Sequence, residues 1–337
     1  MVIGIDNIEV NYFVSGPESE EAVVMLHGWG ANIELFRNAA ALISTKYKVA
    51  APDMPGFGET PEPPAEWTVD DYTDFAVKFI SALGLKKVIL LGHSFGGATV
   101  RTFVSLMAQG SEEEMAATNE AEISPFFTGG KADWIYSVIT LAAPHNGTTA
   151  YNIDENSEDA KTNPIEDMLS NLVSVGTKPK EDSRIKEDYA AYDMYIDNAL
   201  ELNEKLALPE NIYYFSIACS ATEKNEDGTY SPINSKMETL FRSSSALMGA
   251  YTGKTEKGFV IDESWRENDG LVNTCSALYP LGQPHTNYTE GNVQKGTWNV
   301  MPIYYGDHMS LQGGLFVKND VRVYHAEMMN MINCLAK

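Results

Sequence analysis

The stretch KVILLGHSFGG, residues 87–97, places a serine between an apolar run and a pair of glycines. The run KVILL has the composition of a buried strand, and the residues after the glycines, ATVRTFVSLMAQ, predict a helix that ends at Gly110. The centre of the stretch fits the pattern G-x-S-x-G, which marks a nucleophilic serine when a strand precedes it and a helix follows it. Ser94 is therefore the candidate nucleophile, at a helix N-terminus whose dipole favours developing negative charge. The alternative is a chance glycine turn before a helix.

Strands and helices alternate along the rest of the chain. Strands are predicted at residues 1–15, 22–26, 47–51, 137–142, 211–219 and 298–305, and helices at 36–44, 68–83 and 320–335. This alternation is typical of a mostly parallel sheet that is covered by helices on both faces. Together with the turn at Ser94, it predicts an α/β-hydrolase fold.

The chain has 337 residues, which is long for a single core. Residues 151–205 are polar, acidic and weakly periodic, and residues 220–265 form a second irregular segment. Because both segments lie between predicted core strands, we predict one domain over residues 1–337. Within it, residues 151–205 are expected to form a lid and residues 220–265 a second insertion.

The composition restricts the classes of partner. The chain has 24 Lys and Arg residues against 47 Asp and Glu residues, a net charge of −23, and such a surface repels nucleic acid. No apolar run reaches the length of a membrane span. The opening residues, MVIGIDNIEVNYFVSG, have neither a basic region nor an apolar core, so we expect no signal peptide in them. The three cysteines form no C-x-x-C pair; they allow one disulfide and require none.

A second glycine turn, HGWG at residues 27–30, follows the predicted strand at 22–26. Acyl transfer needs backbone N–H donors that point at the oxyanion. In this fold one donor follows the nucleophile and the other comes from the loop after this strand. We therefore predict that the amides of Phe95 and Trp29 form the oxyanion hole. An ordinary glycine turn is the alternative.

The catalytic residues of this fold occur in the order serine, acid, histidine. Among the six histidines, His308 is the candidate base because it follows the last predicted strand directly. Asp269, in the turn-like sequence ENDG, is the best candidate for the acid. For Asp269 a plain Asp-Gly turn is the alternative. Asp53 follows an earlier strand and stays an alternative acid, whereas Asp307 is adjacent to His308 and cannot readily face its ring.

From Gly96 onward the chain resembles the secreted lipases of staphylococci and thermophilic bacilli. The resemblance lies in four segments in the family's order, namely EISPFFTGG at 122–130, TLAAPHNGT at 140–148, WRENDGLVN at 265–273 and GDH at 306–308. It implies that Asp269 and His308 are the catalytic acid and base, and that triacylglycerols and simpler esters are hydrolysed. It also implies a helical lid and secretion. The first 95 residues instead resemble small esterases and dehalogenase-like enzymes of the same fold.

Two metal sites of that family do not carry over to this sequence. The family uses a histidine pair before the serine turn to help bind zinc, but no histidine lies between His27 and His93. Asp193 alone resembles the lid-side aspartate of that site. The family binds calcium with a Glu two residues after the catalytic histidine, where this chain has Ser310. We therefore predict neither metal and no other cofactor.

Residues 164–175, PIEDMLSNLVSV, carry apolar residues at helical spacing. We predict a lid helix whose apolar face covers the Ser94 pocket, with Ile165, Leu169 and Leu172 facing the substrate and a contact to lipid interfaces through the lid. A surface helix packed on the core is the alternative. Because this insertion is shorter than that of the family, a small lid is expected, which favours dissolved or short-to-medium esters over bulk oil.

The sequence thus predicts a carboxylic ester hydrolase, a lipase or esterase, that forms an acyl-enzyme on Ser94 and acts on a small ester or lipid. Thioesterase or peptidase activity is an alternative, since the fold alone does not fix the substrate. Epoxide hydrolase and dehalogenase chemistry needs an aspartate at this turn, which Ser94 excludes. A non-catalytic binding protein would lack a member of the triad, and all three candidates are present.

Overall fold

The computed structural model describes residues 1–65, 67–117, 119, 125–155, 190–314 and 317–335. Its centre is a nine-stranded sheet in the order β1-β2-β4-β3-β5-β6-β7-β13-β12. The strands span Val2–Ile5 (β1), Ile8–Ser15 (β2), Glu21–Leu26 (β3), Lys48–Pro52 (β4), Lys87–His93 (β5), Ile135–Leu141 (β6), Tyr213–Ile217 (β7), His285–Asn287 (β12) and Trp298–Val300 (β13). All pairings of this sheet from β4 to β12 are parallel, and β1–β2 and β2–β4 are antiparallel. The predicted, mostly parallel sheet is confirmed.

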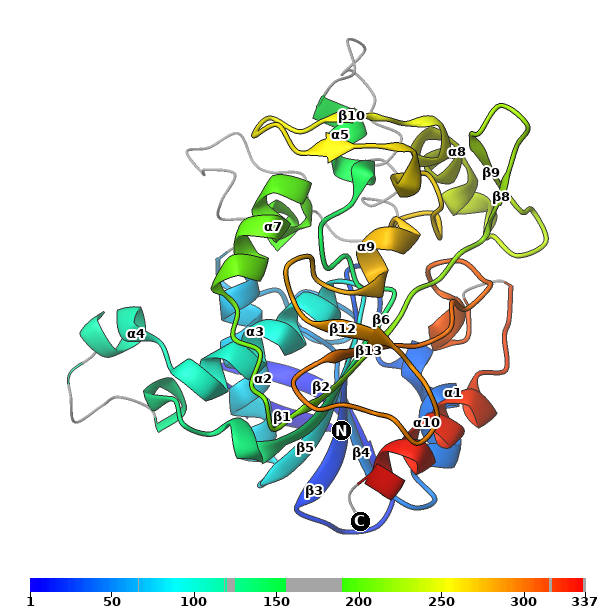
Figure 1. Ribbon diagram of the computed structural model, residues 1–337. Helices are drawn as coiled ribbons and strands as arrows, with labels where there is room; N and C mark the ends of the chain where they lie inside the picture. Colours follow the sequence, from blue (N-terminus) through cyan, green and yellow to red (C-terminus); the bar gives the residue numbers. More distant parts are fainter. Residues whose placement is uncertain (66, 118, 120–124, 156–189, 315–316, 336–337) are drawn as a thin grey trace.

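Helices pack on both faces of the sheet (Figure 1). The α-helices of the sheet layers are α1 (Glu34–Ile43), α2 (Val69–Ala82), α3 (Phe95–Gln109) and α10 (Arg322–Leu335), whereas α4 (Glu112–Ala117) projects at the edge of the molecule. Side chains alternate along β3: Val23 and Met25 join the core beneath α1 and α10, whereas Val24 and Leu26 join the core beneath α2 and α3. A strand buried on both faces in this way explains the unbroken apolar runs in the sequence, and the two cores confirm the α/β-hydrolase fold.

The opening segment differs from the prediction of one strand over residues 1–15. It forms the hairpin β1–β2, in which Ile5 pairs with Ile8. The two residues between them, Asp6 and Asn7, have φ angles of 46° and 66°. Asp and Asn tolerate this left-handed conformation, which tight hairpin turns require. The alternating pattern was correct, but the turn within it was missed.

The last strand of the prediction, residues 298–305, is too long. β13 ends at Val300, and the chain then leaves the strand conformation while it keeps three backbone hydrogen bonds to β7 and the residues after it. The amide of Ser220 donates to Tyr304, and the amides of Met301 and Tyr304 donate to Ser216 and Ala218. Between Met301 and Tyr304 lies Pro302, which has no amide hydrogen to donate to a ladder. The strand therefore ends before the segment reaches His308.

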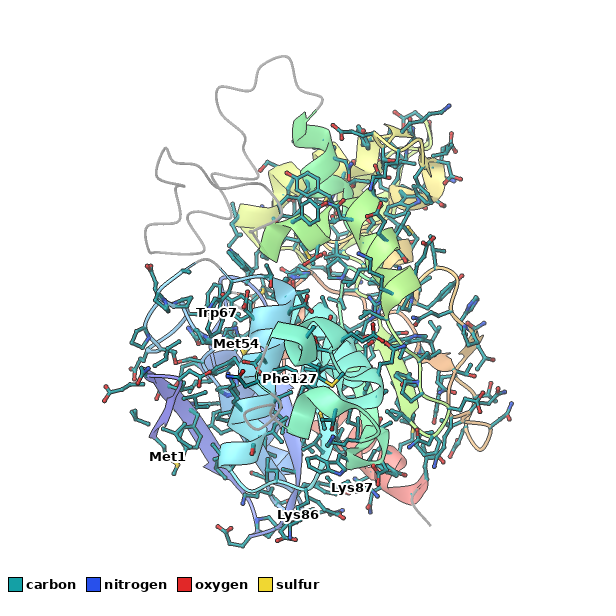
Figure 2. The ribbon with its side chains drawn as sticks, turned by 90° about the vertical axis from the view of Figure 1, so that its left-hand side faces the viewer. Met1, Met54, Trp67, Lys86, Lys87 and Phe127 are labelled. Atoms are coloured by element: carbon teal, nitrogen blue, oxygen red, sulfur yellow. The ribbon has the colours of Figure 1, made fainter. Side chains whose placement is uncertain are left out.

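A cap of shorter elements lies at the end of the molecule above the sheet (Figure 1). Figure 2 shows Lys86 and Lys87, at the start of β5, at the opposite end. The further helices and strands are η1 (Pro125–Thr128), η2 (Ala132–Trp134), α5 (Thr149–Glu155), η4 (Ala190–Met194), α7 (Ile196–Lys205), β8 (Thr222–Lys224), β9 (Tyr230–Pro232), η5 (Thr239–Phe241), α8 (Arg242–Ala250), β10 (Gly253–Lys254), β11 (Val260–Ile261), η6 (Glu263–Trp265), α9 (Thr274–Leu278) and η7 (Ser310–Gln312).

The segment 220–265, expected to be irregular, instead folds into the hairpins β8–β9 and β10–β11 with α8 between them. The predicted lid helix at 164–175, with Ile165, Leu169 and Leu172, lies outside the described residues, so the lid remains a prediction, as does the division into one domain with two insertions. Over the described ranges, no helix has the length and apolar character needed to cross a membrane.

The N-terminus of α2 is fixed by a reciprocal pair of hydrogen bonds. The Thr68 side chain accepts from the amide of Asp71, and the Asp71 carboxylate accepts from the amide of Thr68 at 2.8 Å. This capping box satisfies amides that have no partner within the helix. It also sets the point where α2 begins to cover the sheet.

We expect Thr68→Ala to lower the free energy of unfolding by about 1 kcal/mol, because the cap loses its side-chain acceptor. Urea unfolding followed by circular dichroism measures this loss. The matched control is Ser81→Ala at the exposed end of the same helix, which should leave stability close to that of the wild type. Equal stabilities of the two variants would contradict the role of the cap.

Candidate active site

Ser94 occupies a strained turn between β5 and α3. Its φ and ψ angles are 54° and −125°, a region that residues with a side chain rarely adopt. The turn needs small neighbours: a Cβ at Gly92 would lie 2.2 Å from the carbonyl oxygen of Gly96, and a Cβ at Gly97 would lie 2.3 Å from the side chain of Ala143. Gly92 and Gly97 are therefore required by close contacts on both sides of the serine.

The glycine loop after β3 lies directly against Ser94. A Cβ at Gly28 would come within 2.5 Å of the Ser94 Cβ atom and 3.1 Å of its Oγ atom. The next residue, Trp29, is half-buried, and its ring packs edge-on against Phe95 with centroids 5.9 Å apart. Phe95 is the first residue of α3, so its amide is one of those that the helix itself cannot satisfy. The structure thus brings both predicted oxyanion donors to the serine.

His27 fixes the peptide that carries the Trp29 amide. Its Nδ1 lies 2.8 Å from the carbonyl oxygen of Gly28, while its Nε2 accepts from the amide of Met54 at 2.9 Å. The proton is therefore on Nδ1, and the ring donates to the Gly28 carbonyl. Burial lowers the pKa of His27, which keeps the ring neutral. Because the Gly28 carbonyl and the Trp29 amide belong to one planar peptide, this bond sets the direction of the amide.

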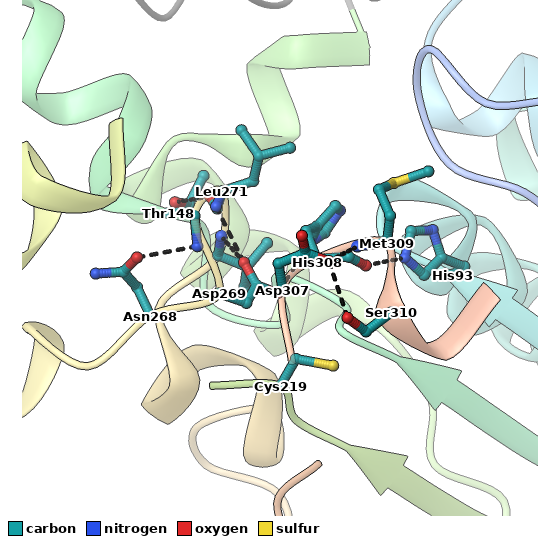
Figure 3. A network of polar contacts seen from close by, with 12 residues as sticks. His93, Thr148, Cys219, Asn268, Asp269, Leu271, Asp307, His308, Met309 and Ser310 are labelled. Atoms are coloured by element: carbon teal, nitrogen blue, oxygen red, sulfur yellow. Dashed lines mark hydrogen bonds and ion pairs between the residues drawn. The ribbon is translucent and has the colours of Figure 1, made fainter. Parts of the chain in front are cut away.

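His308 and Asp269 form a buried pair. The Nδ1 atom of His308 lies 2.9 Å from Oδ2 of Asp269, and the two side chains are 3% and 1% exposed (Figure 3). The other carboxylate oxygen accepts from the amides of Leu271 at 3.0 Å and Val272 at 2.7 Å. The amide of His308 also donates to the Asp269 carbonyl at 2.9 Å. The turn around Asp269 therefore holds both the ring and the backbone of His308.

The alternative acid, Asp53, is occupied elsewhere. It is buried, and its carboxylate accepts from the amides of Ile33 at 2.8 Å and Glu59 at 2.9 Å and from the side chain of Asn11 at 2.8 Å. Ile33 directly precedes α1, so the carboxylate also lies at the positive end of a helix dipole. Through these hydrogen bonds, Asp53 links the loop after β4 to the loop after β3.

Asp307, which was set aside because it neighbours His308, has hydrogen-bond partners other than the ring. Its carboxylate accepts from the amide of Glu238 at 2.8 Å, the hydroxyl of Ser310 at 2.9 Å and the amide of Met309 at 3.2 Å. Burial raises the pKa of Asp307. The carboxylate thus joins the segment before η5 to the turn that follows the histidine.

The pocket above Ser94 is largely apolar. It encloses about 670 Å³ of empty space, open solvent at its mouth included. Its lining consists of Trp29, Gly30, Ser94, Phe95, Pro144, Thr148, Ala150, Tyr151, Met194, Leu271, Val272, His308 and Met309. In this lining, drawn from the described residues, His308 is the only ionisable side chain apart from the phenol of Tyr151. The predicted nucleophile, base and oxyanion donors therefore share one cavity.

The metal sites implied by the resemblance do not fit these residues. Ser310 stands at the calcium position, and its hydroxyl is bonded to Asp307. Asp193 is half-buried, and burial together with the charge of Asp70 raises its pKa to about 6. Over the described ranges, no three His, Cys, Asp or Glu side chains gather closely enough to hold a metal ion. No catalytic step is assigned to a metal.

Sequence reasoning missed one polar residue next to the predicted base. His93 precedes Ser94, and its Nε2 lies 2.7 Å from the carbonyl oxygen of His308 (Figure 3). The position is the variable x of G-x-S-x-G, so the motif gives it no role. Only the fold reveals its contact with a residue 215 positions further along the chain.

Comparison with known proteins gives the family. Residues 21–112 match the alpha/beta hydrolase fold family, and residues 81–174 and 161–337 match the family described as lipase-like, C-terminal domain. The second match covers more than half of the chain. The protein belongs to the lipase-like family. The resemblance that the sequence segments indicated is confirmed.

Named relatives of this lipase-like protein include Lipase 1 of Staphylococcus aureus (strain MRSA252), which is 34% identical over 257 residues, 68% of this chain and 36% of that protein. The chain thus spans little more than a third of the length of such curated relatives. The crystal structure of Staphylococcus hyicus lipase matches with a TM-score of 0.69 at 21% identity, covering 95% of this chain and 97% of that one. The structure of EstA from Clostridium botulinum matches with a TM-score of 0.67 at 23% identity, covering 93% and 87%. These two likenesses show a shared fold.

A buried histidine beneath the site predicts how stability depends on pH. His145 is 1% exposed, and Arg101 lies beside it, with Nη1 3.4 Å from Nδ1. Burial, and then the charge of Arg101, holds the pKa of His145 well below its usual value. The unfolded chain therefore binds a proton below about pH 6.5 that the folded protein does not bind, so stability falls as pH decreases from there toward the folded pKa.

Between pH 6 and pH 5, His145 should cost the wild type about 1.4 kcal/mol of unfolding free energy per pH unit. We expect His145→Gln to lack this contribution, so its stability should fall less on acidification. Urea titrations at several pH values measure the slope. The control is His285→Gln, at an exposed histidine, which should keep the wild-type slope. Parallel pH profiles for the wild type and His145→Gln would show that His145 is not held neutral.

Proposed function

We propose that this lipase-like protein hydrolyses carboxylic esters, with Ser94 as nucleophile, His308 as base and Asp269 as the acid. One observation carries the proposal. A strained serine turn and a histidine whose Nδ1 faces a buried carboxylate at 2.9 Å share one apolar pocket. The names of the relatives, which are lipases, agree with this chemistry.

Each residue then has a defined part in acyl transfer. Ser94 attacks the ester carbonyl while the Nε2 atom of His308 takes the proton of the hydroxyl, and His308 later gives this proton to the leaving alcohol. Asp269 accepts from the Nδ1–H of His308, which keeps the lone pair of Nε2 free for the serine and stabilises the imidazolium. Water, activated by the same histidine, releases the acid from the acyl-enzyme.

The oxyanion is proposed to lie between the amides of Trp29 and Phe95. Both are backbone donors, so their directions depend on the loop and the helix and not on a mobile side chain. The Trp29 amide is oriented through the bond from His27 to the Gly28 carbonyl. Donors that are fixed before the reaction need no reorganisation when negative charge develops, which is the main source of their effect.

The pocket lining supports a neutral, apolar acyl group as the substrate. Aromatic, aliphatic and methionine side chains form most of its wall, and the ring of His308 is the base itself. Such a surface binds acyl chains by removing apolar area from water. We therefore propose acyl esters and acylglycerols as the substrate class. The proposed lid, with Ile165, Leu169 and Leu172, would close this pocket and contact lipid.

Thioesterase and peptidase activities use the same acyl chemistry, but no feature of the described pocket favours a thioester or a peptide over an ester. A role as a non-catalytic binding protein would leave the strain at Ser94 without a purpose. Strained backbone of this kind costs about 1–3 kcal/mol and persists where function requires it.

Replacement of the nucleophile tests the reaction. We expect Ser94→Ala to lose ester hydrolysis by a factor on the order of 10⁶, because nucleophile and base act as one unit. The measurement is hydrolysis of p-nitrophenyl esters of graded chain length, with fluorophosphonate labelling as a second readout. Ser81→Ala, on the exposed end of α2, is the control and should hydrolyse and label as the wild type does. Undiminished turnover by the folded Ser94→Ala protein would end the proposal.

The choice of acid is tested by a matched pair of aspartates. Asp269→Asn should lower turnover by a factor on the order of 10⁴, because the amide cannot hold the ring in the required tautomer. Asp307→Asn changes the neighbouring carboxylate, which contacts amides and a hydroxyl instead of the ring, and is expected to cost far less turnover. A severe loss of turnover in Asp307→Asn together with a mild loss in Asp269→Asn would show that Asp269 is not the acid.

A further inference from the structure

His93 joins the nucleophile turn to the backbone of His308. The residue is 1% exposed, and its Nε2 lies 2.7 Å from the His308 carbonyl oxygen. The two imidazole rings lie next to each other, with centroids 4.8 Å apart at an angle of 52°. Because His93 immediately precedes Ser94, the hydrogen bond links the nucleophile turn directly to the backbone of the proposed base.

The contact fixes the tautomer of His93. A carbonyl oxygen only accepts, so the proton of the neutral ring must be on Nε2. The other nitrogen, Nδ1, is buried and has no hydrogen-bond partner among the described residues. A buried polar atom without a partner is costly. An apolar side chain would fill the space without that cost, so the bond to His308 is the feature that distinguishes a histidine here.

Among the described residues, three hydrogen bonds hold His308. Its amide donates to the Asp269 carbonyl at 2.9 Å, its ring Nδ1 faces the Asp269 carboxylate at 2.9 Å, and its carbonyl accepts from His93. The first two contacts fix His308 relative to the acid. Only the third, from His93, fixes it relative to β5 and therefore to Ser94. Reaction at the serine depends on this last separation.

We propose that His93 is a positioning residue that holds His308 at the correct distance from Ser94 through the His308 carbonyl. This inference rests on the proposed function, since it concerns the geometry of the proposed nucleophile and base. Misplacement of a reacting group by about 1 Å can cost about 10² in rate, while substrate binding is unaffected. The effect should therefore appear in kcat and leave KM nearly unchanged.

The neutrality of His93 suits this position. Burial, followed by the charge of His308, holds the pKa of His93 well below its usual value. A charged ring at this place would oppose the imidazolium that forms on His308 during acyl transfer. A neutral donor supplies the hydrogen bond without that repulsion.

Three substitutions separate a donor at Nε2 from a side chain that only fills space. His93→Leu removes the donor. His93→Gln places an amide nitrogen at about the reach of Nε2, whereas the amide of His93→Asn reaches only to the level of Nδ1. We expect His93→Leu and His93→Asn to lower kcat for a p-nitrophenyl ester about 10²-fold with little change in KM, and His93→Gln to recover most of the activity.

The second readout does not depend on turnover. In ¹⁵N–¹H spectra of the histidine rings, the signal of the His308 Nδ1 proton, which faces Asp269, should move in the Leu and Asn variants and stay in place in the Gln variant. If the wild type hydrolyses no ester, the proposed function fails, and the spectra still test the position of His308.

Two results would overturn the role of His93. One is a kcat for His93→Leu within about twofold of the wild type, with an unchanged His308 signal. The other is equal losses in the Gln and Asn variants, which indicates that the ring only fills space. If His93→Leu fails to fold, the comparison of Gln with Asn decides the question.

Discussion

The backbone of Ser94 is held in a conformation that a residue with a side chain avoids, and the central part of the sheet supplies what holds it there. The Ser94 amide donates to the Leu141 carbonyl of β6 at 2.9 Å, and its own carbonyl accepts from Gly97 at 2.8 Å. On the other side, Gly28 approaches within contact distance of the serine. Strain of this kind survives only where the surroundings leave the chain no other path. The strands β3, β5 and β6 lie side by side, and their contacts therefore stabilise the strained conformation of Ser94.

The histidines around this turn act on the backbone. His27 holds the Gly28 carbonyl and is held by the amide of Met54, while His93 holds the His308 carbonyl. In both cases a neutral ring with a fixed tautomer determines where a neighbouring peptide lies. The third histidine, His308, is the one that lines the pocket. Two neutral rings therefore bind the peptides next to the ring that we propose transfers the proton.

The sequence predicted much of this arrangement because some of its signals are local. The serine turn at Ser94 and the apolar runs of the parallel strands need only neighbouring residues to be recognised. Local signals could not decide between Asp269 and Asp53 as the acid, since each follows a strand and each is an aspartate in a turn. What separates them is a distant partner: the ring of His308 for Asp269, and the amide of Ile33 at the start of α1 for Asp53. Such contacts are set by tertiary packing.

Other features escaped prediction for equally physical reasons. The turn at Asp6 and Asn7 lies inside an alternating pattern that is the same for one strand as for two. The hairpins and helix of residues 220–265 are short elements of the cap, so their own periodicity is weak. The proposed role of His93 depends on a single contact with a residue 215 positions further along the chain, for which the motif around it provides no signal.

The contact between His93 and His308 bears on when the proposed active site can form during synthesis. His93 and His308 are separated by 215 positions, so the turn with the proposed nucleophile leaves the ribosome long before the proposed base does. Contacts of such long range form late, because a large loop must close first. A nascent chain would carry Ser94 without a proton acceptor until the last strand and the segment after it have folded. On the proposed assignment of nucleophile and base, the serine hydroxyl would stay unactivated until these parts of the fold are complete.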